Sequence, residues 1–272
     1  MDTANAAGRI LLGIPLGFAP RGPIEAAFEL ARWLGSGIEA VLMPHAGLQS
    51  LGVIPFAREF QPLLNAWTDV GVERIERDRR AAIRRCEEEI ARFAAGFGVP
   101  GLVRVAEGEA AAALDENGRP GAVIAIPAPR RRGEEQFTLY PLLIEQALRG
   151  PSSTLLLPQP SARRSGPVLA VVQGDDDPAR DVAERIARAA DAKLVIARHG
   201  EAPGSAPRSM SSAGLRERGL VLSGDVVRAL TGGWRDMGER VVVLSSRAAP
   251  CLAAAAALDI VLARRVPLLI VK

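Results

Sequence analysis

The sequence is short of cysteine, and this shortage excludes two classes of protein. Its 272 residues contain only two cysteines, Cys86 and Cys251, one in each half. Two thiols this far apart make neither the disulfide framework of a small secreted domain nor the closely spaced ligands of a zinc site. We therefore expect two reduced thiols and no bound metal.

Long apolar runs and lysine are lacking as well. No apolar stretch reaches the roughly 20 residues that a membrane-spanning helix needs, and the N-terminus MDTANAAGRI has no apolar signal core. Lysine occurs only at Lys193 and Lys272, and the many arginines are interspersed with acidic residues to a net charge of +3. Because there is neither a spanning segment nor a basic stripe, we expect a cytoplasmic protein with no membrane and no nucleic-acid partner.

What the sequence does contain is a strand, helix and strand unit in residues 167–199. Residues 168–172 and 194–197 are apolar runs of strand length, and residues 178–190 carry apolar side chains at helical spacing. Asp177 and Pro178 suit the N-cap and the first turn of that helix. Two buried strands joined by one helix predict a parallel pair with a right-handed crossover.

The N-terminal half repeats this unit and extends it. Apolar runs at residues 10–14 and 38–43 flank a helical stripe over residues 22–34. A long amphipathic helix is predicted over Val72 to Phe97, and a loop with a short helix around Phe56 to Trp67. Further strands are expected at residues 102–105, 122–126 and 154–157, with helices over residues 109–114 and 136–149.

The C-terminal half repeats the alternation with one loss. Its remaining strands are expected at residues 219–222, 240–244 and 267–271, and its helices over residues 225–230 and 251–264. Residues 199–218 are too rich in proline, glycine and serine for a counterpart of the long helix. An internal duplication explains the pattern, with one domain over residues 1–158 and a smaller one over residues 167–272. The predicted fold class is α/β: two tandem five-stranded parallel sheets, doubly wound and Rossmann-like, the second lacking one helix.

Two pieces of the sequence resemble a known family. VAEGEAAAALDENGRPGAVIAIP, residues 105–127, is similar to the strand, Glu-Gly turn, helix and strand of universal stress proteins, and RRVPLLIVK is similar to their closing strand. With its two consecutive units, the chain resembles a tandem, UspA-like universal stress protein. The resemblance implies the strand order 3-2-1-4-5 in each half, which places each fifth strand at a sheet edge.

Exposed edges predict how the halves join. An unpaired fifth strand invites pairing, so we expect the two fifth strands to meet across a pseudo-twofold axis and make an intra-chain pseudo-dimer. A shared apolar interface is expected from Leu155, Leu157, Leu268 and Ile270. Because the second sheet lacks one helix, we expect its under-covered face to be protected by another subunit or a protein partner.

Nucleotide-binding members of this family carry an acidic residue after strand one and a glycine motif after strand four. The glycines let backbone N–H groups approach the phosphates without a Cβ in the way. Here Pro15 and Gln173 stand at the acidic positions, Gly133 is followed by Gln136 where the motif needs a second glycine, and residues 247–272 contain no glycine. The resemblance implies ATP or AMP as cofactor, but the motif that would bind it is absent and the cofactor stays unknown.

Two clusters are the candidate cofactor-binding residues. Gln173, Gly174 and Asp175 follow the first strand of the second half, where carboxylates could hold Mg²⁺ or a ribose, or could favour the positive end of the next helix. Arg130, Arg131 and Arg132 stand where the family binds phosphates. They could bind a phosphate through charged bidentate bonds, or they could form a solvated loop with local ion pairs.

No set of catalytic residues can be assembled from the sequence. His45 and His199 end strands taken as equivalent, where each could be a general base or a hydrogen-bonded edge residue, but neither has a nucleophile or a metal-ligand spacing nearby. Cys251 lies at a predicted helix start, where its thiol could be redox-sensitive or could simply pack.

The leading hypothesis is a universal stress protein-like, non-catalytic module that acts in a stress response or in regulation through ligand or protein binding. Two alternatives stay open. The first is an ATP- or AMP-binding protein with weak ATPase activity, and the second is a nucleotide-binding subunit like those of electron-transfer flavoproteins.

Overall fold

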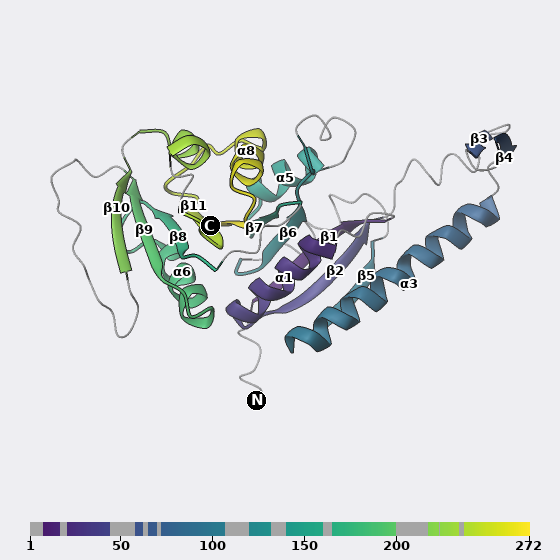
Figure 1. The fold of residues 1–272 in the computed structure, drawn as a ribbon, viewed down its shortest axis with the longest axis horizontal. Helices are drawn as coiled ribbons and strands as arrows, with labels where there is room; N and C mark the ends of the chain where they lie inside the picture. The colour runs from purple at the N-terminus through teal and green to yellow at the C-terminus, as the bar shows by residue number, and fades with distance from the viewer. Residues whose placement is uncertain are drawn as a thin grey trace.

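The computed structural model describes residues 8–16, 21–43, 58–61, 65–69, 72–106, 120–131, 140–159, 165–199, 217–222, 224–233 and 237–272. These residues form one ten-stranded sheet with helices on both faces, together with a separate two-stranded hairpin (Figure 1). The first half supplies strands β1 (Arg9–Pro15), β2 (Gly37–Met43), β5 (Gly101–Val105), β6 (Val123–Pro127) and β7 (Ser153–Leu157). The second half supplies β8 (Val168–Val172), β9 (Leu194–His199), β10 (Glu217–Leu222), β11 (Val241–Ser245) and β12 (Leu268–Val271).

The strand order is β10-β9-β8-β11-β12-β7-β6-β1-β2-β5. Read outward from the middle, each half has the order fifth, fourth, first, second and third strand, and all pairs within a half are parallel. The α/β class with a mostly parallel sheet is therefore confirmed. The expectation of two separate sheets is wrong, because β12 and β7 pair antiparallel and join the halves into one sheet.

The pairing of the two fifth strands is confirmed, and it locates the pseudo-twofold axis. Leu155 lies directly opposite Leu269, and the flanking pairs are Leu156 with Leu268 and Thr154 with Ile270. The axis passes through the central pair, because Leu155 and Leu269 hold equivalent positions in their halves. Both edges gain hydrogen-bond partners in this way, which removes the need to cover either of them.

The four residues expected to share one interface lie on opposite faces of the sheet. Leu155 and Leu157 belong to one buried cluster, and Leu268 and Ile270 belong to the other. The antiparallel register is the reason, because it sets Leu155 beside Leu269 and moves Leu268 to the opposite side of the pleat. Leu269 is the residue that the prediction missed.

Each face of the sheet carries its own helices. One face is covered by α1 (Arg21–Leu34), α3 (Val72–Phe97) and α6 (Pro178–Ala189), and the other by α5 (Tyr140–Arg149), α7 (Val226–Arg228), the π-helical turn η3 (Ala229–Gly233) and α8 (Ala254–Arg264). Helices α1 and α6 contact each other across the junction of the halves, and α1 also packs on α3 through Phe28, whose ring stacks on those of Phe93 and Phe97. The central strands β6, β7, β8, β11 and β12 are largely apolar because both of their faces are buried, whereas the edge strand β5 is partly exposed.

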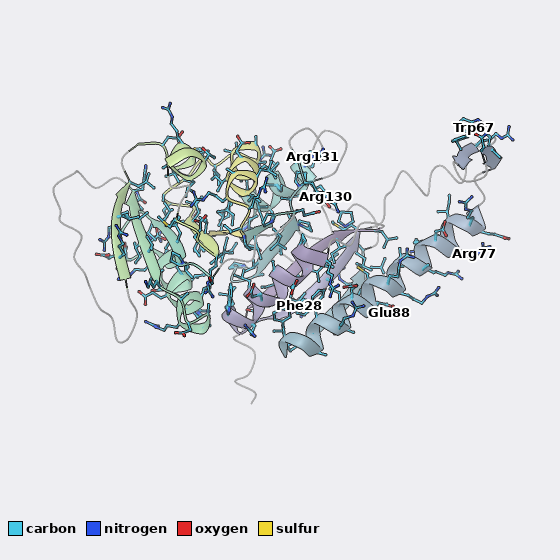
Figure 2. The ribbon with its side chains drawn as sticks, viewed as in Figure 1. Phe28, Trp67, Arg77, Glu88, Arg130 and Arg131 are labelled. Carbon is cyan, nitrogen blue, oxygen red and sulfur yellow. The ribbon has the colours of Figure 1, made fainter. Side chains whose placement is uncertain are left out.

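The segment before α3 is a β-hairpin, so the helix predicted around Phe56 to Trp67 is wrong. Strands β3 (Arg58–Gln61) and β4 (Ala66–Asp69) pair antiparallel, with Phe60 opposite Trp67 and their ring centroids 5.5 Å apart. A cross-strand aromatic pair stabilises a hairpin, and Asn65 adopts the positive φ of 46° that a tight turn needs. The hairpin and Trp67 lie beyond the amino end of α3, away from the main sheet (Figure 2).

The capping prediction for the central unit is confirmed. Asp177 is the N-cap of α6 and accepts a hydrogen bond from the Ala179 N–H at 3.0 Å, with Pro178 in the first turn. Its second carboxylate oxygen accepts one from the Gln173 N–H, also at 3.0 Å. The predicted helix at residues 109–114, and most of residues 199–218 where no long helix was expected, lie outside the described residues. Among the helices that are described, none combines the length and the apolar character that a membrane span requires.

Candidate functional site

A cavity of about 460 Å³ lies at the carboxyl ends of β1 and β2. Open α/β sheets bind ligands at this edge, and in the first half the strand order reverses between β1 and β6, so the cavity lies on the β2 side of that point. The strand ends supply an apolar floor through Ile14, Pro15 and Leu42. Helix α3 supplies the opposite wall through residues between Ala82 and Arg92, and one of them, Glu88, is labelled in Figure 2. We call this space the α3 cavity.

The wall from α3 mixes charges of both signs around one thiol. Arg85, Glu88, Glu89 and Arg92 line the cavity, and the Arg92 guanidinium donates to the Glu89 carboxylate at 3.0 Å. Burial, together with the nearby carboxylates of Glu89 and Glu87, raises the pKa of the Cys86 thiol to about 11. The thiol is therefore protonated at neutral pH, a form that is a poor nucleophile and a poor metal ligand.

The ladder register identifies the matching place in the second half. Ile10 in β1 lies between Ile38 of the second strand and Val123 of the fourth strand of its half. Val168 in β8 lies in the same way between Leu194 and Val241, so Ile10 and Val168 are equivalent. Counting along these strands equates Leu42 with Arg198. The floor of the α3 cavity is thus apolar where the second half carries a guanidinium.

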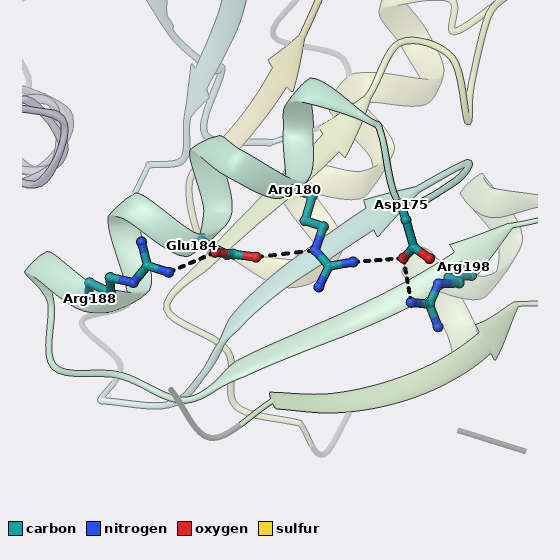
Figure 3. A network of polar contacts seen from close by, with 5 residues as sticks. All are labelled: Asp175, Arg180, Glu184, Arg188 and Arg198. Atoms are coloured by element: carbon teal, nitrogen blue, oxygen red, sulfur yellow. Dashed lines mark hydrogen bonds and ion pairs between the residues drawn. The ribbon is translucent and has the colours of Figure 1, made fainter. Parts of the chain in front are cut away.

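This guanidinium belongs to a chain of ion pairs that occupies the carboxyl edge of β8 and β9 (Figure 3). Arg198 donates to the Asp175 carboxylate at 2.6 Å, and Arg180 donates to the same oxygen at 2.7 Å. Glu184 accepts from Arg180 at 3.1 Å and from Arg188 at 2.9 Å, which extends the chain along α6. The hydrogen bond from Arg198 is the main reason why the pKa of Asp175 is lowered. We call these five residues the arginine network.

The arginine network changes what the first candidate cluster can do. Asp175 already shares one carboxylate oxygen between two guanidinium groups, and both oxygens of Asp177 bind backbone N–H groups. Gln173 contributes its backbone N–H to that cap, and Gly174 lies between them in the turn. The adjacent carboxylates therefore point to different partners, and within the described ranges no three acidic, His or Cys residues are grouped to hold a metal ion.

The second candidate cluster lies at a different place. Arg130 and Arg131 follow β6 and are labelled beside α5 in Figure 2, whereas Arg132 lies outside the described residues. They line a pocket of about 600 Å³ whose other walls come from the end of β7, from η3 and from α8. Neither Gln173, Gly174 nor Asp175 lines this pocket, so the structure does not bring the two candidate clusters together.

The position that matches His199 in the first half holds no histidine. The register equates His199 with Met43, and His45 lies outside the described residues. The Nε2 atom of His199 is 3.0 Å from the Gly224 carbonyl oxygen. Of the two roles expected for this residue, the contact matches the hydrogen-bonded edge residue. Cys251 is exposed and precedes the start of α8 at Ala254, so the helix begins three residues later than predicted and Cys251 lies outside its first turn.

Comparison with solved structures finds the same fold over almost the whole chain. A universal stress protein from Archaeoglobus fulgidus DSM 4304 superposes with a TM-score of 0.64 at 12% identity, covering 98% of this chain and 96% of that one. A protein of unknown function from Pseudomonas aeruginosa PAO1 has a TM-score of 0.58 at 14% identity, with 98% and 93% covered. The cytoplasmic domain of a prokaryotic cation chloride cotransporter has a TM-score of 0.55 at 11% identity, with 97% and 94% covered.

Sequence comparisons add no closer relative. No protein-family model matches the chain, and no curated protein matches it. Identities of 11–14% to the solved structures show a shared fold. The function has to be argued from the site.

Proposed function

We propose that this protein is a universal stress protein-like, non-catalytic regulatory module that binds one small ligand per chain in the α3 cavity. The observation that carries the proposal is the contrast between the two carboxyl edges. The first half has a cavity of about 460 Å³ over an apolar floor, whereas Arg198 and its partners occupy the matching place in the second half. Small-ligand sites commonly have this size and combine apolar walls with a few polar groups.

The walls of the α3 cavity suggest a ligand with an apolar body and a polar edge. Ile14, Pro15 and Leu42 offer contact area for a flat or aliphatic group, and the mixed charges of α3 offer hydrogen bonds to a polar rim. A protonated Cys86 thiol supplies neither a nucleophile nor a strong metal ligand. Recognition without turnover is the role that such a set of groups supports.

The proposal includes the organisation expected from the duplication. Residues 1–158 and 167–272 are taken as two domains that act as a pseudo-dimer, of which only the first binds the ligand. Binding in the α3 cavity would fix α3 against the strand ends, and the resulting change in the helix surface is the signal that a protein partner would read.

Mass spectrometry of small molecules released from the denatured, purified protein tests the proposal. We expect at most one equivalent of a single compound per chain, and its identity separates the alternatives, since ATP or AMP would indicate a nucleotide-binding protein and a flavin an electron-transfer role.

Ala82 lines the α3 cavity and Ala81 does not. Ala82→Phe should therefore abolish retention of the compound, while Ala81→Phe, the same change on the same helix, should leave it. Two equivalents per chain, or full retention by Ala82→Phe, would contradict the proposal.

A further inference from the structure

The pocket beside Arg130 and Arg131 exists only because the two halves pair. Its volume is about 600 Å³, and Gln159, just after β7, forms one wall while Arg265, at the end of α8, forms another. Antiparallel pairing brings the carboxyl end of β7 next to the amino end of β12, which begins three residues after Arg265. Neither half could make this pocket alone. We call it the inter-half pocket.

Positive charge dominates the wall of the inter-half pocket. Among the described residues, its lining includes three arginines, Arg130, Arg131 and Arg265, and one carboxylate, that of Asp259. Arg130 and Asp259 each already have a polar partner, so the exposed guanidinium groups of Arg131 and Arg265 supply the charge for a ligand. Guanidinium groups bind carboxylates and phosphates in a bidentate manner.

Arg265 has a left-handed backbone conformation, which at helix ends is usually adopted by glycine. Arg265 caps α8 in the left-handed conformation with a φ of 57°, and its N–H bonds the Val261 carbonyl at 2.8 Å. Glycine adopts this conformation without the steric cost that a Cβ brings. An arginine here gives up local stability and places a guanidinium at the mouth of the pocket.

A buried amide lies in the wall between these charges. The Gln159 side chain is 5% exposed, and neither its Oε1 nor its Nε2 has a hydrogen-bond partner in the described part of the chain. The buried hydroxyl of Tyr140 lies beside this amide and interacts with it only weakly, so neither group has a well-formed hydrogen bond. Buried polar groups are nearly always hydrogen-bonded, because leaving one unpaired forfeits its interaction with water. An amide can bind a ligand group that has both a donor and an acceptor.

We propose that the inter-half pocket binds a small organic dianion, whose acidic groups contact Arg131 and Arg265 and whose uncharged polar group contacts Gln159. The site differs from the α3 cavity in position and in charge, and the proposal does not depend on the function proposed above. A ligand here would contact both halves, so its binding would strengthen their pairing.

Calorimetric titration of the full chain with inorganic phosphate and, separately, with succinate tests the charge requirement. We expect at least one of these dianions to bind with a dissociation constant of about 1 mM or lower. Binding of phosphate would identify a phosphate-bearing ligand, and binding of succinate alone would identify a dicarboxylate. The double variant Arg131→Ala/Arg265→Ala should bind at least about tenfold more weakly, because two charged hydrogen-bonding groups are lost.

The matched control removes the same charge elsewhere. Arg185 and Arg218 are exposed and lie outside the inter-half pocket, so Arg185→Ala/Arg218→Ala should bind the dianion like the parent. Ala82→Phe should also bind it unchanged, which separates this site from the α3 cavity. No binding of either dianion by the parent, or equal losses in the two double-arginine variants, would overturn the proposal.

Gln159→Met distinguishes a ligand-binding amide from a structural one. Methionine keeps the approximate volume and removes an amide that has no partner, so the melting temperature should stay the same or rise. The affinity for malate, a dicarboxylate with a hydroxyl group that can contact the amide, should fall by at least about threefold, since one neutral hydrogen bond is lost. A lower melting temperature with unchanged affinity would show that Gln159 is structural and would refute its part in the site.

Discussion

The two halves of the sheet share their strand order and differ at their carboxyl edges. Leu42 and Arg198 hold equivalent positions, and Leu42 lies in an apolar cavity floor whereas Arg198 belongs to an ion-pair network. The first strands of the two halves, β1 and β8, are both apolar and buried along most of their length. The same strand order can therefore carry an apolar cavity floor in one copy and an ion-pair network in the other.

The third strands differ in a second way. Gly101 lies in β5 under α3, and the register equates it with Glu217 in β10. A Cβ at Gly101 would come within 3.2 Å of the Ala94 and Ile90 side chains, so glycine permits the close approach of α3 to the sheet. The strand sequence in the first half is thus adapted to the helix that covers it.

Charges placed at the pseudo-twofold axis should have the largest effect and should test whether the halves are equivalent there. Leu155 and Leu269 face each other with exposures of 0% and 1%, so Leu155→Asp and Leu269→Asp should each lower the free energy of unfolding by at least about 4 kcal/mol. Urea denaturation measures both. The control is Leu102→Asp on the edge strand β5, where the side chain is 65% exposed and the change should stay within about 0.5 kcal/mol.

Near-equal losses at the two positions would support the pseudo-symmetry of the junction. A loss confined to one of them would mean that the halves do not depend equally on the β7–β12 pair. If either variant does not fold, Leu155→Ala and Leu269→Ala allow the same comparison, with expected losses of about 2–5 kcal/mol each.

An intermediate effect is expected where α3 meets the first half. Gly101→Ala places a methyl group against Ala94, Ile90 and Phe28 at 3.2–3.3 Å, and overpacking of this kind costs about 1–3 kcal/mol. Gly96→Ala is the matched control, because Gly96 lies in α3 with nothing within 4 Å of the position that a Cβ would take, and it should gain up to about 1 kcal/mol. Chemical denaturation should give opposite signs for the two variants. The same sign would contradict the tight fit of α3 on β5.

Much of the fold could be predicted from the sequence because strands buried on both faces are apolar runs. The central strand, helix and strand unit, the Asp177 cap and the long helix over Val72 to Phe97 all follow from local patterns. The hairpin was missed because its stability comes from the Phe60 and Trp67 pair, which is invisible until the strands are set in register.

The sites could be predicted only in part. Asp175 and the arginines after β6 stand out in the local sequence. Arg198 does not, because a charged residue at the end of an apolar strand gives no signal until the two halves are aligned and Leu42 is found at the matching position. Gln159 and Arg265 were missed for a stronger reason. They meet through the antiparallel junction of the halves, a tertiary contact that no local pattern encodes.

The smallest effect is expected at the arginine network, where pH can show whether Asp175 acts through its charge. Its pKa is lowered from the ordinary value of 3.8, chiefly by the hydrogen bond from Arg198, so the folded state favours the ionised carboxylate. The stabilisation is fully present above about pH 4 and is lost as the pH falls through the lowered pKa. Because the side chain is 68% exposed, Asp175→Asn should lower the free energy of unfolding at pH 7 by no more than about 1 kcal/mol.

The difference between the parent and Asp175→Asn should shrink as the pH falls below about 4, because the parent carboxylate then becomes neutral as well. Denaturation curves at several pH values between neutral and acidic measure this convergence. Asp176→Asn is the control, since Asp176 is exposed, next in sequence and outside the arginine network. If the difference in the free energy of unfolding between the parent and Asp175→Asn persists unchanged at low pH, Asp175 acts through its shape and not through its charge. The contrast between the two carboxyl edges would then rest on packing around Arg198 instead of on its ion pairs.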